Sequence, residues 1–241
     1  MPEIPFVMYS HSEYSDVWIP FISQKAKHLP NFGENIAFID KPSNILHSNW
    51  KQIFYKEKYT YSKRLICCLK QLNAEYCIFS HEDMFLYIAP KKEIITRYIT
   101  IMQEDNLDFV KLIKGGQCTY ETHKKEKTLH IIDNKYSEWI FAIQPSIWKI
   151  NSLISILKQH KSTNIWKLEE KAQNTCKKLN IKGAFSFERG EKRGEYHWDN
   201  TVYPYIATAI VKGKWNISEY PDVLPEILKE YHIDVNKRGI F

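Results

Sequence analysis

Apolar residues follow two alternating patterns along this chain. Short continuous runs are typical of buried strands, and apolar positions three or four residues apart are typical of helices with one buried face. The runs that predict strands lie at residues 4–9, 35–40, 76–79, 109–113, 129–132 and 139–143. The spacing that predicts helices lies at residues 59–73, 92–104 and 165–179, with weaker patterns at 17–22, where Pro20 interrupts the helix, and near 153–157. Strands that alternate with helices predict an α/β fold.

The segments between these elements show no boundary between domains. No stretch rich in Pro, Gly or Ser divides the chain, and no internal repeat is present. Residues 115–127 are polar and predict a loop. We therefore expect residues 1–241 to form a single domain, which is an ordinary length for one hydrophobic core.

Composition and charge exclude several classes of protein. With 44% hydrophobic and 26% charged residues, the chain has enough apolar material to fold. The 34 Lys and Arg exceed the 28 Asp and Glu by six, but they are scattered, and the densest cluster, Lys124 to Lys127, contains Glu126. This distribution favours solvated surface charge, so we expect no nucleic-acid partner.

The cysteines and the N-terminus indicate the cellular environment. The five cysteines are odd in number and form no CxxC pair, which favours a reducing compartment over a disulfide framework. The first residues lack the features of a signal peptide, and no stretch reaches the roughly 18 apolar residues of a membrane span. We expect a cytoplasmic protein without a transmembrane segment, which can still act at a membrane surface.

The most informative polar residues are Glu82 and Asp83, which follow the predicted buried strand 76–79. Ligands of open α/β sheets bind beyond the carboxyl ends of strands, and carboxylates there can hold a divalent cation that neutralises phosphates. The same two residues can also do no more than open a loop or cap the next helix. Their position after a buried strand favours the cation site.

A second acidic residue, Glu169, borders the apolar face of the predicted helix 165–179 and lies close to Trp166. A carboxylate in such a place can have a raised pKa and serve as a general base. Glu169 can equally be a surface residue that pairs with Lys167 or Lys171. The pattern alone leaves both interpretations open.

A third group of polar residues lies near the C-terminus and includes His197, Lys212 and Lys214. Histidine is a common metal ligand, and lysines close to it can stabilise a leaving diphosphate. Each residue taken alone is typical of a protein surface. Only their concentration in one region favours a site.

The order of these motifs resembles that of nucleotide-sugar-dependent glycosyltransferases of the GT-A type, in particular small bacterial, phage and large-virus members with a central xED motif. The matching residues are Tyr76 to Leu86, Gln144 to Trp148, Trp166 to Glu169 and Lys212 to Trp215. The resemblance implies one GT-A-like domain with a mixed, mostly parallel central sheet flanked by helices. Its Rossmann-like N-terminal half, about residues 1–115, would bind the nucleotide sugar, and about residues 116–241 would bind the acceptor.

The resemblance also implies a role for each matching residue. Asp83 would coordinate Mn²⁺ or Mg²⁺ on the diphosphate of the donor, with the pattern His-Glu-Asp here in place of the family's Asp-x-Asp, and His197 would complete the metal site. Glu169 would be the catalytic base of an inverting transfer. The residues expected around the nucleotide are Tyr9, Ser10, Ser12, Asp40, Arg64, Lys212 and Lys214, and those expected along the substrates are Glu82, Gln144, Trp148 and Trp166.

The sequence thus predicts transfer of a sugar from a nucleoside-diphosphate sugar, with a UDP-sugar favoured, to a hydroxyl group of a glycan or lipid-linked acceptor. Two alternatives remain open. One is a metal-dependent nuclease or phosphoesterase that uses Glu82, Asp83 and His197. The other is a non-catalytic carbohydrate-binding module, because the 7 Trp, 15 Tyr and 12 Phe can also serve as stacking platforms.

Overall fold

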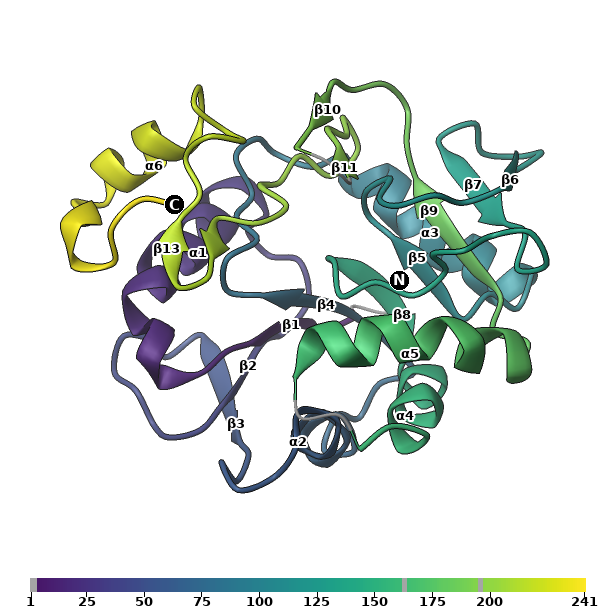
Figure 1. Cartoon of the computed structure of the whole chain (residues 1–241), viewed down its shortest axis with the longest axis horizontal. Coiled ribbons are helices and arrows are strands. Elements are labelled where there is room, and N and C mark those ends of the chain that lie inside the picture. Colours follow the sequence, from purple (N-terminus) through teal and green to yellow (C-terminus); the bar gives the residue numbers. More distant parts are fainter. Residues whose placement is uncertain (1–3, 162–163, 195–196) are drawn as a thin grey trace.

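The structure, a computed structural model, describes residues 4–161, 164–194 and 197–241. A nine-stranded sheet lies between layers of helices (Figure 1). Its strands in spatial order are β3 (Trp50–Phe54), β2 (Asn35–Ile39), β1 (Phe6–Tyr9), β4 (Tyr76–His81), β8 (Ser146–Lys149), β5 (Phe109–Lys111), β9 (Gly183–Ser186), β7 (Leu129–Ile132) and β6 (Tyr120–Thr122). Since β8 and β7 run against the other seven strands, the sheet is mixed and mostly parallel, which confirms the expected fold class.

The alternation of side chains along each strand divides the core into two layers. In β1, Phe6 and Met8 point to one face of the sheet, whereas Val7 and Tyr9 point to the other. The helices that cover the first face are α1 (Ser15–His28), α3 (Lys92–Glu104) and α6 (Leu224–Glu230). The helices on the second face are α2 (Tyr61–Leu69), α4 (Ile150–Lys158) and α5 (Ile165–Lys178). Burial on both faces is why the central strands appear in the sequence as apolar runs.

The prediction of a strand at residues 139–143 was wrong. The N–H of Ile140 donates to Gln173 Oε1 at 2.7 Å, and the N–H of Ile143 donates to Glu169 Oε1 at 2.6 Å. Side chains of α5 therefore accept the backbone hydrogen bonds that a neighbouring strand would otherwise accept. The strand that pairs with β4 is instead β8, a few residues later.

Three further elements differ from the sequence prediction. Strand β3 lies at an edge of the sheet with Lys51 and Phe54 exposed, and β6, within the predicted loop, is exposed throughout, so neither has the apolar run of a central strand. Helix α1 continues through Pro20. A proline in the second turn removes one backbone hydrogen bond, while Trp18 and Phe21 of the same helix are buried.

The C-terminal part of the chain returns to the end of β4. Ala209 donates its N–H to the carbonyl of Asp83 at 2.9 Å, and Leu86 pairs with Tyr205. Beyond this contact, β12 (Ile210–Val211) and β13 (Lys214–Trp215) form a short hairpin. A second two-stranded sheet consists of β10 (Lys192–Arg193) and β11 (His197–Trp198), at the top of Figure 1.

Both parts of the chain contribute to the nine-stranded sheet. Residues before 115 supply β1 to β5, and residues after 116 supply β6 to β9. The assignment of a nucleotide-binding and an acceptor-binding half stays a prediction. Among the described residues, no helix combines the length and the apolar character needed to cross a membrane.

Candidate functional site

The turn after β1 is hydrogen-bonded to the end of β2. Ser12 donates its N–H to Asp40 Oδ1 and its hydroxyl to Asp40 Oδ2, each at 2.6 Å. Burial acts to raise the pKa of Asp40, but these hydrogen bonds outweigh it and hold the pKa below its ordinary value. The fold thus brings Ser12 and Asp40 together. Ser10 is buried beneath them, where its hydroxyl accepts the indole N–H of Trp18 at 2.6 Å.

Tyr9, at the end of β1, belongs to a cluster of aromatic rings. It stacks on Tyr55 with ring centres 5.3 Å apart and lies edge-on to Tyr61 at 5.1 Å. The guanidinium of Arg64 lies 5.0 Å from the centre of the Tyr55 ring. Burial raises the pKa of Tyr9, and Arg64 acts against this shift. The expected residues Tyr9 and Arg64 are therefore neighbours, and Tyr55, which follows the unpredicted edge strand β3, completes their cluster.

Glu82 and Asp83 lie where β4 ends, under the returning C-terminal segment. Glu82 is 8% exposed, and among the described residues its Oε2 atom is buried without a hydrogen-bond partner. Burial raises the pKa of both carboxyl groups, and the charge of Asp83 raises that of Glu82 further. An orphaned carboxylate oxygen beside a second carboxylate fits a bound divalent cation, since such an ion stabilises both charges.

A buried tyrosine connects the two acidic centres that the sequence singled out. The Tyr61 hydroxyl lies 2.9 Å from His81 Nε2. Burial raises the pKa of Tyr61, and the carboxylates of Glu169 and Glu82 raise it further. Burial lowers the pKa of His81 to about 3, so its ring is neutral. Tyr61 thus contacts the last residue of β4, and the carboxylate of Glu169 on α5 is close enough to raise the pKa of the same phenol.

Glu169 is half-buried, and no ion pair joins it to a lysine on the described part of α5. Its Oε1 accepts the N–H of Ile143 at 2.6 Å. Burial raises the pKa of Glu169, while this hydrogen bond and the ammonium group of Lys111 act against the shift. Lys111 ends β5 and is fully buried, with Nζ 3.4 Å from the Trp139 carbonyl. A single lysine after an apolar strand gave no sequence signal for this contact.

The remaining residues expected along the substrates lie in different settings. Trp166 is 71% exposed at the start of α5. Trp148 is 2% exposed, with its ring centre 4.6 Å from that of Phe109, so its prediction as a substrate contact was wrong. The cause is that β8 is a central strand and the indole points into the layer under α4 and α5. The Gln144 amide lies against Gly115, where a Cβ would come within 2.6 Å of it.

The expected C-terminal residues lie on the two small hairpins. His197 Nε2 is 3.3 Å from Glu219 Oε2, and burial lowers the pKa of His197. Lys212 and Lys214 are exposed on the hairpin that begins beside Asp83. Within the described ranges, Asp83 and His197 do not belong to a common group of three metal-ligating side chains.

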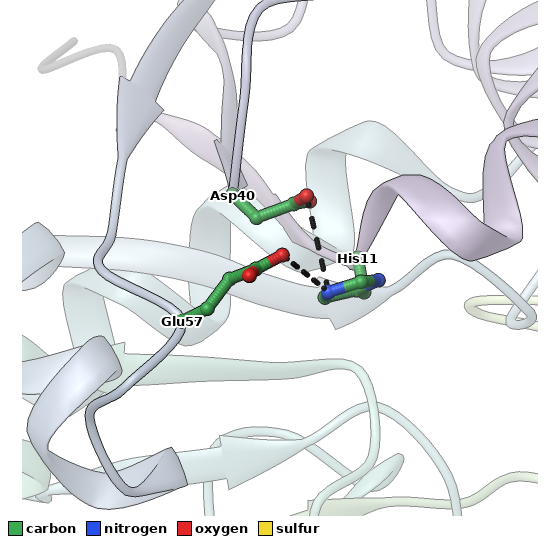
Figure 2. Close-up of side chains that lie close together, drawn as sticks. All are labelled: His11, Asp40 and Glu57. Carbon is green, nitrogen blue, oxygen red and sulfur yellow. Dashed lines mark hydrogen bonds and ion pairs between the residues drawn. The ribbon is translucent and has the colours of Figure 1, made fainter.

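One such group does occur in the described part of the chain, formed by His11, Asp40 and Glu57. His11 Nε2 lies 3.2 Å from Glu57 Oε1 and 3.8 Å from Asp40 Oδ2. Figure 2 shows the three side chains converging on one point. A histidine between two carboxylates forms ion pairs of its own when protonated, so the arrangement needs no metal. Sequence reasoning missed Glu57 because it follows the unpredicted strand β3.

A cavity of about 380 Å³ lies beyond the carboxyl ends of β5 and β9. Its lining includes Lys114, Tyr120, Tyr136, Glu138 and Trp198. A second cavity, of about 410 Å³, lies between α1 and α6. The sequence predicted neither, because their walls come from loops with no regular pattern.

No protein-family model and no curated protein matches the chain. A solved structure of CMP-2-keto-3-deoxy-manno-octonic acid synthetase with CTP is similar over 76% of this chain and 88% of that chain, with a TM-score of 0.51 and 10% identity. The S. aureus protein TarS, residues 1–349 with UDP-GlcNAc, is similar over 79% of this chain and 60% of that chain, with a TM-score of 0.46 and 18% identity. The bifunctional IspDF from Campylobacter jejuni is similar over 78% of this chain, with a TM-score of 0.46 and 15% identity. The match covers 50% of the length of IspDF. Identities this low concern the fold alone.

Proposed function

We propose that this chain is a glycosyltransferase that moves a sugar from a nucleoside-diphosphate sugar, with a UDP-sugar favoured, to a hydroxyl group of a glycan or lipid-linked acceptor. The observation that carries the proposal is the pair formed by the buried Glu82 and the half-buried Asp83 at the end of β4, with the orphaned Glu82 oxygen. Ser12 follows β1, which pairs with β4, and Asp40 follows β2, the next strand along, where a nucleoside would lie near its diphosphate.

Glu82 and Asp83 are the residues that would hold Mn²⁺ or Mg²⁺. A divalent ion bound there would neutralise the charge that develops on the departing diphosphate. Lys212 and Lys214 are exposed on the hairpin next to Asp83, and their ammonium groups would lie beside the same phosphates.

Glu169 would act on the acceptor. Its Oε1 atom accepts the Ile143 N–H, which fixes the carboxylate while leaving lone pairs for a proton. Burial raises its pKa, which brings a carboxylate closer to the basicity that a general base needs. As the acceptor oxygen bonds to the anomeric carbon, Glu169 takes the hydroxyl proton, and the bond from that carbon to the diphosphate oxygen breaks. A single displacement of this kind inverts the anomeric centre.

The test combines donor binding with product analysis. The full chain is heated with UDP-, GDP-, TDP- and CMP-sugars, with and without Mn²⁺, and the donor that raises the melting temperature is then incubated with candidate acceptors. Release of nucleoside diphosphate with a glycosylated acceptor is the expected result. Release of pyrophosphate from a nucleoside triphosphate would show nucleotidyl transfer instead, and salt-dependent cleavage of DNA or RNA would show a nuclease.

The variant Asp83→Asn sharpens this test. We expect it to lose about a hundredfold or more of transfer and the Mn²⁺-dependent part of the thermal shift. The matched control is Glu121→Gln, which changes an exposed carboxylate on β6 and should leave both unchanged. Transfer by Asp83→Asn at the wild-type rate contradicts the proposal.

A further inference from the structure

Aromatic rings and lysines gather around the cavity beyond β5 and β9. Lys114 Nζ lies 4.7 Å from the ring centre of Trp198, 5.0 Å from that of Phe187 and 5.6 Å from that of Tyr120. Lys192 places its Nζ 5.6 Å from the same Trp198 ring. Two ammonium groups therefore share one indole at this cavity.

These ammonium groups are held over rings and not in ion pairs. Within the described residues, neither Lys114 nor Lys192 has a carboxylate within 4.0 Å, whereas the adjacent Arg193 pairs with both Asp199 and Asp222. A cation–π contact holds an ammonium group without neutralising its charge. The two ammonium groups thus keep their charge beside a cavity whose lining also includes the carboxylate of Glu138, and an anionic ligand group is a natural partner for the two lysines.

The cavity also has the mixed lining that a sugar ring requires. Its volume of about 380 Å³ is near the lower end of small-molecule sites, roughly 300–1,000 Å³, which suits a short saccharide better than a polymer face. Tyr120 is 37% exposed and Tyr136 is 62% exposed, so both offer ring surface to the C–H groups of a sugar. Gln117 and Glu138 add hydrogen-bonding groups of both kinds for sugar hydroxyls.

The position of the cavity relates it to the proposed catalytic groups. Strands β4 and β5 run in the same direction on either side of β8, about 10 Å apart, and the cavity and Glu82 both lie beyond the carboxyl ends of these parallel strands. Beneath the cavity, the buried Nζ of Lys111 lies 3.5 Å from the carbonyl of Gly115, which belongs to the lining. Lys111 is also close enough to Glu169 to lower its pKa.

We propose that this cavity is the acceptor subsite and that it binds a sugar ring carrying an anionic substituent, a carboxylate or a phosphate, which pairs with Lys114 and Lys192. The role of this cavity as an acceptor subsite rests on the proposed transferase function, whereas its binding of an acidic sugar does not depend on that function. The site is therefore testable by binding alone.

Isothermal titration of the full chain with three probes tests the site. The probes are methyl glucuronide, glucose 6-phosphate and the neutral methyl glucoside. We expect at least one acidic probe to bind about tenfold or more tightly than the neutral one, the gain typical of a charge-assisted contact. The acidic probe that binds identifies whether the group is a carboxylate or a phosphate.

Lys114→Gln should remove the preference for the acidic probe, and Tyr136→Ala should weaken the binding of all three probes. The matched control is Lys63→Gln, because Lys63 makes the same kind of contact, 4.0 Å from the Tyr59 ring, outside this cavity. If Lys114→Gln does not fold by circular dichroism, the exposed Lys192→Gln carries the test.

Equal binding of acidic and neutral probes by the wild-type chain overturns the proposal, as does a preference that survives the lysine substitutions. Donor binding is followed separately by the thermal shift with nucleotide sugars. Lysine-dependent binding of an acidic sugar without any donor binding would overturn the transferase function and keep the cavity. Transfer to neutral acceptors only, at a rate that Lys114→Gln does not change, would support the transferase function and overturn the proposed role of the cavity.

Discussion

Glu169 makes a structural contact and is also the residue proposed as the general base. Its carboxylate accepts the Ile143 N–H, so it helps to hold residues that were expected to be a strand. The same carboxylate is half-buried near Tyr61 and Lys111. A substitution that keeps the accepting oxygen and removes the basicity separates these two contributions.

Glu169→Gln is that substitution. The amide oxygen can still accept the Ile143 N–H, so we expect unfolding by urea to be unchanged, while transfer falls by about 10²- to 10⁴-fold because the proton acceptor is lost. Glu169→Ala should lose activity and also about 1 kcal/mol of stability. The control Glu170→Gln changes an exposed carboxylate one residue along α5 and should change neither. Full activity of Glu169→Gln would leave the residue with its structural contact only.

Helix α1 buries the amine of Lys25, which forms no ion pair with a carboxylate among the residues that the structure describes. Lys25 is 4% exposed, and its Nζ lies 5.4 Å from the Phe6 ring centre. Burial, and then the charge of Lys92, lowers the pKa of Lys25 from 10.5 to about 8. The folded protein therefore binds fewer protons than the unfolded chain between these pH values, so this group makes stability rise with pH across that window.

Lys25→Met should accordingly stabilise the protein at pH 7, by about 2 kcal/mol, because the penalty for burying the charged amine disappears. The gain should shrink as pH rises from about 8 towards 10.5. Urea unfolding of both proteins across this range measures the difference. Lys27→Met, an exposed position on the same helix, should show no such pH-dependent gain; a pH-independent gain for Lys25→Met would contradict the assigned pKa.

On the scale of the whole molecule, the C-terminal region packs back onto the end of β4 and onto helix α1. It pairs with the segment after Asp83, and Arg238 then reaches helix α1, where it forms a two-pronged ion pair with Asp16 and donates to the Glu13 carbonyl. The side chain of Arg238 is 14% exposed. An ion pair shielded in this way couples more strongly than one on the open surface.

A double-mutant cycle of Asp16→Asn and Arg238→Met should give a coupling energy of about 1 kcal/mol in urea unfolding. The more exposed pair Lys27 and Glu230, with side chains 49% and 41% exposed, provides the control and should couple by less than about 0.5 kcal/mol. Equal coupling in the two cycles would show that the Arg238 contact does not hold the C-terminal region in place.

The sequence by itself determined the strands that are buried on both faces and the helices with one clear buried face. The hydrophobic patterns of central strands such as β4 and of helices such as α5 are strong enough to predict these elements, because their buried positions are apolar and recur at a fixed period. It also placed Ser12 with Asp40, and Glu82 with Asp83, at the ends of the strands, where chain order and strand direction constrain position. The aromatic count, by contrast, left Trp148 and Trp166 indistinguishable.

Only the tertiary structure decided that Trp148 is a core residue, that Glu169 accepts the backbone N–H of Ile143, and that Lys114 lies beside a cavity over the Trp198 ring. These outcomes depend on which segments contact each other in the fold. Edge strands and loops have no regular hydrophobic period from which those contacts could be predicted. Buried hydrogen-bonding groups must find partners, and residues far apart in the sequence often provide them. Which residues do so is decided only when the whole chain has folded.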